Sequence, residues 1–165
     1  MPKKVRKRNP FPADFLIALR ALVNVHHSIY PLVPPQGIYF EALVEEAFKK
    51  AKKPFTPIES TTRNQPIHDL DVDGLRISLK TETGEATRLL QISITKLCTT
   101  EKEPWTPEVL VERVQQHLAR YDVILMLRAV WRPPGIHYQL VEIPIDLLRL
   151  ISASNNCAGW TPLGP

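Results

Sequence analysis

The chain has 165 residues, of which 44% are apolar and 23% are charged. These fractions match the averages of soluble globular proteins, so they exclude a mainly disordered chain and predict one domain with its own core. No stretch approaches the roughly 20 apolar residues that a membrane span needs. The two cysteines, Cys98 and Cys157, are far apart, which excludes a disulfide-rich scaffold and favours a reducing cytoplasm.

Positive charge is concentrated at the start of the chain. The formal net charge is +4, from 21 Lys and Arg against 17 Asp and Glu. Five of these cations stand close together: Lys3, Lys4, Arg6, Lys7 and Arg8. We therefore expect a flexible basic arm over 1–10 and a single domain over 11–165. Such an arm gains affinity for polyanions by displacing counterions, or else it serves only as a solvated tail that aids solubility.

Two amphipathic helices are predicted in the first third of the chain. Apolar residues recur at helical spacing over 11–25 and again over about 38–51. In the second helix, Glu41 and Glu45 lie one turn apart on a strip beside the apolar stripe. Positive charge favours a helix C-terminus, and four lysines mark the end of this helix: Lys49, Lys50, Lys52 and Lys53.

A β-hairpin is predicted over 68–82. Asp73-Gly74 joins two runs of alternating apolar and polar residues, and this dipeptide favours a two-residue hairpin turn. Because side chains alternate along a strand, the two runs separate into a buried face and a polar face. The buried face carries Leu70, Val72, Leu75, Ile77 and Leu79, and the polar face carries Asp69, Asp71, Arg76, Ser78, Lys80 and Glu82.

The rest of the chain alternates strands and helices. We expect a strand over 89–97, a helix over 107–121, a strand over 123–130, a strand over 136–143 and a short helix over 146–151. The 123–130 segment is almost entirely apolar, which is typical of a strand inside a sheet with both faces covered. The predicted fold class is therefore α/β, with a single mixed central β-sheet flanked by helices.

Acidic residues and a lysine share the polar face of the hairpin. Carboxylates grouped in this way suit a hard cation such as Mg²⁺, and a neighbouring lysine can orient a water molecule or neutralise charge on a phosphate. Asp69, Asp71 and Lys80 therefore suit metal-assisted hydrolysis of a phosphodiester. The same residues also suit a solvent-facing hairpin whose charges pair across the strands.

The segment from Asp69 to Thr81 resembles the catalytic hairpin of the PD-(D/E)xK nucleases, most closely type II restriction endonucleases with a Ser-x-Lys motif. The resemblance implies a restriction-endonuclease-like fold, a metal-binding carboxylate at Asp69 and a catalytic lysine at Lys80. Asp71 points the same way as Asp69 and remains an alternative ligand. Two positions depart from the family pattern. His68 stands where a proline is usual, and Ser78 stands where an acid is usual.

Ser78 cannot supply the negative charge that a divalent metal prefers. The resemblance implies that a carboxylate from another element then completes the site. The second helix usually packs beside the hairpin in this superfamily, so Glu41 is preferred and Glu45 comes next. Glu82, on the same strand face as Lys80, is a competing donor. The two helix residues also suit an ordinary solvated face that pairs with Lys49.

Together, the residues and the resemblance predict a Mg²⁺-dependent endonuclease of the type II restriction class, acting on double-stranded DNA in the cytoplasm. The basic arm and the lysines at 49–53 would contact DNA phosphates. Cleavage of both strands with one active site per chain calls for a homodimer, or for a partner subunit in a heterodimeric nuclease. The alternative is a domain of nuclease-like fold that binds nucleic acid or a protein partner without cutting.

The histidines outside the hairpin have no recognisable catalytic context. His117 falls within the predicted helix 107–121 and His137 within the predicted strand 136–143, and neither stands near a nucleophile motif. The chain also lacks GxxxxGK[ST], GxGxxG and GxSxG sequences. This argues against P-loop nucleotide hydrolysis, dinucleotide binding and serine esterase chemistry.

Overall fold

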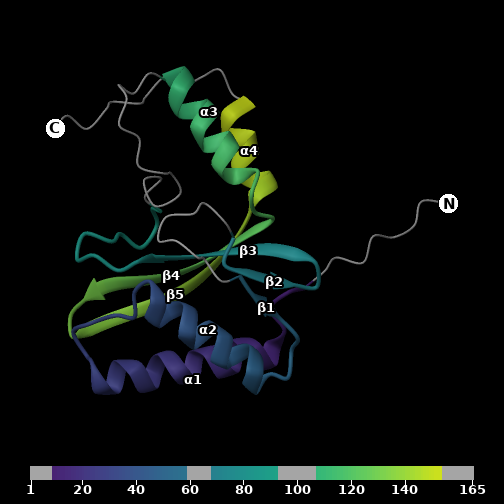
Figure 1. Ribbon diagram of the computed structural model, residues 1–165. Coiled ribbons are helices and arrows are strands. Elements are labelled where there is room, and N and C mark those ends of the chain that lie inside the picture. The colour runs from purple at the N-terminus through teal and green to yellow at the C-terminus, as the bar shows by residue number, and fades with distance from the viewer. Residues whose placement is uncertain (1–8, 59–67, 93–106, 154–165) are drawn as a thin grey trace.

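The computed structural model describes residues 9–58, 68–92 and 107–153. Within these ranges the chain forms a five-stranded mixed sheet flanked by helices, which confirms the predicted fold class (Figure 1). The helices are α1 (Ala13–Ile29), α2 (Ile38–Lys50), α3 (Pro107–Leu118) and α4 (Ile145–Ala153). The strands are β1 (Thr56–Pro57), β2 (Leu70–Val72), β3 (Leu75–Glu82), β4 (Val123–Arg132) and β5 (Gly135–Pro144).

The sheet has the strand order β1-β2-β3-β4-β5, so neighbours in the chain are neighbours in space. The pairs β1–β2, β2–β3 and β4–β5 are antiparallel, whereas β3 and β4 are parallel. A parallel pair needs a crossover connection, and α3 lies on the connection between β3 and β4. The strand that carries Lys80 is thereby placed at the centre of the sheet.

The predicted hairpin of β2 and β3 is confirmed. Asp73 and Gly74 both have positive φ, 52° and 74°, which is the backbone conformation of a type I′ turn. The turn pairs Leu70 with Ile77 and Asp71 with Arg76. This register determines which side chains of the two strands share a face.

Helices cover both faces of the sheet. Figure 1 shows α1 and α2 on one side and α3 and α4 on the other. One hydrophobic core lies between the sheet and the first helix pair, and a second includes residues of the C-terminal helices. In β4, Leu125 and Leu127 belong to the first core, and Ile124 and Met126 belong to the second. This strand is therefore apolar on both faces, as the sequence predicted.

The polar face of β3 differs from the expectation of a solvent-facing strand. Ser78 is 0% exposed and Glu82 is 6% exposed, and Lys80 is half-buried. The parallel partner β4 places Ile124, Met126 and Arg128 beside these three residues. Because this side of the sheet also carries the second core, Ser78 and Glu82 are enclosed and need partners within the protein.

The strand predicted over 89–97 is not present in its described part. Residues 89–92 form turns and irregular backbone, and residues 93–97 lie outside the described ranges. The buried Arg128 guanidinium donates hydrogen bonds to the carbonyl oxygens of Arg88, Leu89 and Gln91. These carbonyls are thus engaged by a side chain instead of a neighbouring strand. The segment folds back over β4 as an anchored loop.

Two further expectations concern the periphery. Of the predicted arm over 1–10, residues 1–8 with all five cations lie outside the described ranges, as do both cysteines. No helix in the described part of the chain combines the length and apolar character that crossing a membrane requires.

Candidate active site

Asp69 is fixed against β3 by three hydrogen bonds. Its backbone N–H donates to the Ile77 carbonyl oxygen at 2.8 Å. Its Oδ2 atom accepts from the Leu79 backbone N–H at 2.6 Å and from the Ser78 hydroxyl at 3.2 Å. Within the described ranges, the other carboxylate oxygen has no hydrogen-bond partner. Asp69 therefore has a defined orientation and one oxygen available for a ligand.

Ser78 supports Asp69 by donating a hydrogen bond. Its side chain is completely buried, and the hydroxyl points at Asp69 Oδ2. A carboxylate at this position would place a second negative charge against Asp69 instead of a donor. The departure from the acidic pattern therefore has a local function in this chain: Ser78 orients the aspartate.

Glu41 comes from α2 and lies in the electrostatic field of the hairpin. Phe40, Val44 and Ala47 bury one stripe of this helix, and Glu41 lies at the edge of that stripe. Burial raises the pKa of Glu41, and the charge of Asp69 raises it further, while the charge of Lys80 lowers it. Such effects fall off with distance, so Glu41 lies within electrostatic range of Asp69 and Lys80 although it is distant from them in sequence.

Glu45 lies one turn further along α2. Its charge adds a smaller contribution that also raises the pKa of Glu41. Both glutamates are half-buried, so the solvated face that was the alternative for this helix is only partly realised. The lysine salt bridges of α2 instead involve Glu46, which pairs with Lys49 at 4.0 Å and with Lys50 at 3.6 Å.

Asp71 belongs to a different group of charges. Its Oδ1 atom is 3.1 Å from His68 Nε2, and its charge contributes to the raised pKa of Arg76. Arg76 in turn forms a two-pronged ion pair with Asp122, with nitrogen–oxygen distances of 3.0 and 3.1 Å. Although Asp71 shares a strand face with Asp69, its described partners lie at the edge of the candidate site.

Glu82 is held by a buried ion pair. Its Oε2 atom accepts from Arg128 Nε at 2.6 Å, and both side chains are almost completely buried. The same guanidinium donates to Gln139 Oε1 at 2.9 Å. The carboxylate that the sequence offered as a competing metal ligand is therefore neutralised by an arginine.

Two aromatic residues border the site: His117, which had no recognisable catalytic context in the sequence, and Tyr121, which the sequence interpretation did not consider. Tyr121 Oη and His117 Nε2 share a hydrogen bond of 3.1 Å, and the Lys80 ammonium lies 5.8 Å from the centroid of the Tyr121 ring. Burial, followed by the charges of Lys80 and Arg120, lowers the pKa of His117 to about 4. The spacing of four residues, one helical turn, was the available signal that these two side chains face the same way.

Of the basic residues predicted to bind DNA, only the lysines at 49–53 are described, two in the last turn of α2 and two just after it. Lys52 is exposed, whereas Lys53 pairs with Asp73 in the hairpin turn. The pairs of Lys49 and Lys50 with Glu46 are solvent-exposed and therefore weak. Lys49, Lys50 and Lys52 therefore remain accessible to a polyanion.

The donor set of the candidate site fits Mg²⁺. In the described part of the chain, no cluster of three or more His, Cys, Asp and Glu residues forms a complete protein cage for a metal. Mg²⁺ does not need such a cage, because it is usually bound by one or two carboxylates together with water and substrate phosphates. Burial, and then the charge of Asp69, raise the pKa of Glu41, and a divalent cation would offset both effects.

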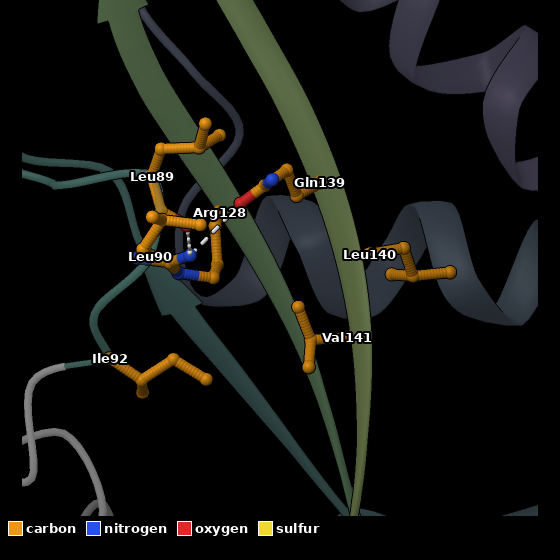
Figure 2. Close-up of a pocket in the computed structure, with 7 residues that line it drawn as sticks. All are labelled: Leu89, Leu90, Ile92, Arg128, Gln139, Leu140 and Val141. Atoms are coloured by element: carbon orange, nitrogen blue, oxygen red, sulfur yellow. Dashed lines mark hydrogen bonds between the residues drawn. The ribbon is translucent and has the colours of Figure 1, made fainter.

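A cavity of about 520 Å³ lies beyond the Glu82 end of β3 (Figure 2). Its lining includes Leu89, Leu90 and Ile92 from the anchored loop and Arg128, Gln139 and Val141 from β4 and β5. This lining contains no carboxylate, and its guanidinium is occupied by the hydrogen bonds described above. The cavity therefore differs in chemistry from the site around Asp69.

Comparisons with known proteins find related type II restriction enzymes. Residues 7–159 match the SmaI family, described as "Type II site-specific deoxyribonuclease". Over 111 residues the chain is 34% identical to the type II restriction enzyme SmaI of Serratia marcescens, an alignment that covers 66% of this chain and 45% of that enzyme. The match thus spans less than half the length of this curated relative. No solved structure matches at a significant level.

Proposed function

Since the chain belongs to the SmaI family of type II site-specific deoxyribonucleases, we propose that it hydrolyses phosphodiester bonds of double-stranded DNA in a Mg²⁺-dependent reaction. The observation that supports this proposal is that Asp69, which the buried Ser78 orients, and Lys80 both act electrostatically on Glu41. We assign the hairpin to the PD-(D/E)xK pattern, with Ser78 in the usual acidic position and Glu41 as the substitute acid.

In this assignment Asp69 and Glu41 hold the metal. When bound there, Mg²⁺ would neutralise charge on the scissile phosphate and acidify a water molecule. Asp69 is suited to the role because Ser78 and the Leu79 N–H hold one of its oxygens, which fixes the direction of the other. Glu41 is suited because its charge is costly beside Asp69 until a cation neutralises it.

Lys80 is assigned to the attacking water and the phosphate. Its ammonium group donates hydrogen bonds and can align a water molecule for in-line attack or offset negative charge on phosphate oxygens. The attack forms one bond from phosphorus to the water oxygen and breaks one phosphorus–oxygen ester bond.

The proposed DNA contacts lie outside the catalytic group. The arm residues and the exposed lysines at 49–53 supply sequence-independent attraction to phosphates. Deleting residues 2–8 should flatten the salt dependence of DNA affinity, by about 0.9 in the log–log slope for each phosphate that the arm neutralises. An unchanged slope would leave the arm with a solubility role. We further propose a homodimer, or a heterodimer with a second subunit, acting in the cytoplasm, and light scattering would give the mass.

Plasmid cleavage tests the proposed activity. The wild-type protein should convert supercoiled plasmid to linear products with Mg²⁺ and lose this activity with a chelator. Lys80→Ala and Asp69→Asn should abolish cleavage while the thermal unfolding midpoint changes little for Lys80→Ala. Asp146→Asn serves as a matched control, because this carboxylate is exposed and pairs with a neighbour on α4. DNA binding without cleavage by the wild type would favour the non-catalytic alternative.

A further inference from the structure

The Tyr121 ring is held rigidly in the core, and it lies beside Lys80, whose long side chain is flexible. It lies in the short connection between α3 and β4, is 2% exposed, and belongs to the core cluster with Leu118, Ile124 and Met126. Its backbone N–H donates to the Leu118 carbonyl oxygen at 3.3 Å. Packing on several sides therefore determines the orientation of its ring.

Lys80 approaches this ring closely enough for a cation–π interaction. The distance from Nζ to the ring centroid is 5.8 Å, within the range in which an ammonium is attracted to an aromatic face. A lysine has a flexible four-carbon stem, and in the described part of the chain no ion pair restrains Lys80. The Tyr121 ring is then the contact that defines where the ammonium lies.

His117 also contacts Tyr121. The two rings meet edge to face, with centroids 5.1 Å apart and an interplanar angle of 82°. The hydrogen bond of 3.1 Å between Oη and Nε2 adds a directional restraint. His117 is itself 8% exposed, so the pair forms a buried support below Lys80.

We propose that Tyr121 and His117 are positioning residues, which place the Lys80 ammonium for attack on the phosphodiester. The inference rests on the proposed nuclease activity. It adds that the Lys80 position is set by the C-terminal end of α3, an element that contributes no ligand to the metal. A misplacement of about 1 Å in a reacting group can reduce a rate by about 100-fold, so a loose lysine has a measurable consequence.

Three variants separate the ring from its hydroxyl. Tyr121→Leu removes the aromatic face, Tyr121→Phe keeps the face and loses the hydrogen bond, and His117→Leu removes the support. In single-turnover plasmid cleavage, we expect Tyr121→Leu to be slower by about 10- to 100-fold. Tyr121→Phe should lose less, and His117→Leu should fall between them. DNA affinity measured with Ca²⁺ in place of Mg²⁺ should stay within about twofold, because positioning affects the rate and not phosphate binding.

The protein offers a matched control in a second His–Tyr pair. Tyr138 on β5 and His27 on α1 have ring centroids 5.5 Å apart at 79°, and Tyr138 Oη lies 3.3 Å from His27 Nδ1. Tyr138 packs against the other core, between the sheet and the first two helices. Tyr138→Leu should therefore leave the cleavage rate of the folded protein unchanged.

A proton NMR measurement detects the contact between Lys80 and Tyr121 independently of catalytic activity. In the wild type, the ring current of Tyr121 should shift the Lys80 ε-methylene protons upfield, and the absence of this signal in Lys80→Arg assigns it. The shift should disappear in Tyr121→Leu and persist in Tyr121→Phe. Should Tyr121→Leu not fold, His117→Leu decides, with a reduced shift and a reduced rate expected.

The two proposals fail in different ways. If the wild type cleaves no DNA, the proposed function is wrong, and the methylene shift still reports whether Tyr121 restrains Lys80. If the wild type cleaves DNA while folded Tyr121→Leu or, in its place, His117→Leu cleaves at the wild-type rate, the positioning inference is overturned. A loss of rate in Tyr138→Leu equal to that in Tyr121→Leu would also contradict it, because it would indicate a general effect of core disruption.

Discussion

Asp69 and Glu82 are two carboxylates on the same face of the sheet, and they differ in how their charge is balanced. Glu82 meets the buried Arg128, whose guanidinium also binds Gln139 and three loop carbonyls. Asp69 accepts two hydrogen bonds on one carboxylate oxygen. Its negative charge and the positive charge of Lys80 both act on Glu41, so these three charges are not paired one to one as those of Glu82 and Arg128 are. A buried charge that has its partner destabilises the fold only when that partner is removed, whereas a charge without such a partner is available for a ligand.

The Glu82 end should dominate stability. Arg128→Met leaves Glu82 without its arginine and removes the donors from the loop carbonyls, so we expect the free energy of unfolding to fall by about 3–5 kcal/mol. Urea denaturation followed by circular dichroism measures this loss. Arg149→Met, which breaks an exposed pair with Asp146, is the control and should change stability by less than about 1 kcal/mol. Equal losses of stability in Arg128→Met and Arg149→Met would show that the buried ion pair contributes no more to stability than the exposed one.

The Asp69 end should dominate activity. Glu41→Gln removes a carboxylate that we propose as a metal ligand, and because metal binding contributes several kcal/mol to such a transition state, cleavage should fall by at least about 100-fold. Glu45→Gln, one turn away on α2, should have a smaller effect. Glu82→Gln should destabilise the protein but leave the folded fraction active. If Glu82→Gln is folded but inactive while Glu41→Gln is active, Glu82 and not Glu41 is the second carboxylate of the metal site.

Protonation of His117 should make the free energy of unfolding depend on pH. Its pKa is about 4 in the folded protein, against 6.5 for an ordinary histidine, so the unfolded chain binds more protons between these values. The stabilising contribution is present above pH 6.5 and is lost as the pH falls toward 4, up to about 3 kcal/mol in total. His117→Phe should flatten this part of the stability profile. If the stability of His117→Phe depends on pH as steeply as that of the wild type, other titrating groups cause the dependence.

Ser78 tests the orientation of Asp69 with the smallest change. Ser78→Ala removes the hydroxyl that donates to Oδ2 but keeps the Leu79 N–H bond, so we expect a stability loss of about 1 kcal/mol. Cleavage should fall by about tenfold through a less well oriented Asp69. Ser78→Glu should be worse than Ser78→Ala, because it buries a second negative charge beside Asp69. An active Ser78→Glu protein would show that the usual acidic position still accepts a metal ligand here.

Much of the architecture could be predicted because the relevant signals are local. The type I′ turn at Asp73-Gly74, the apolar run of β4 and the apolar stripes of α1 and α2 each follow from short-range spacing. The segment 89–92 was predicted wrongly as strand for the converse reason. Its apolar residues suit a strand, but its carbonyls are held by Arg128, nearly forty residues later in the chain.

The sequence alone determined the hairpin, its register and the alternation that puts Asp69, Ser78 and Lys80 on one face, because period and turn type are properties of adjacent residues. The tertiary structure decided which carboxylates remain available. It brought Glu41 toward Asp69, neutralised Glu82 with Arg128, and placed Tyr121 and His117 against Lys80. These interactions join residues separated by the crossover and by the first two helices. Charge compensation depends on distances in space, which residue spacing along the chain does not contain.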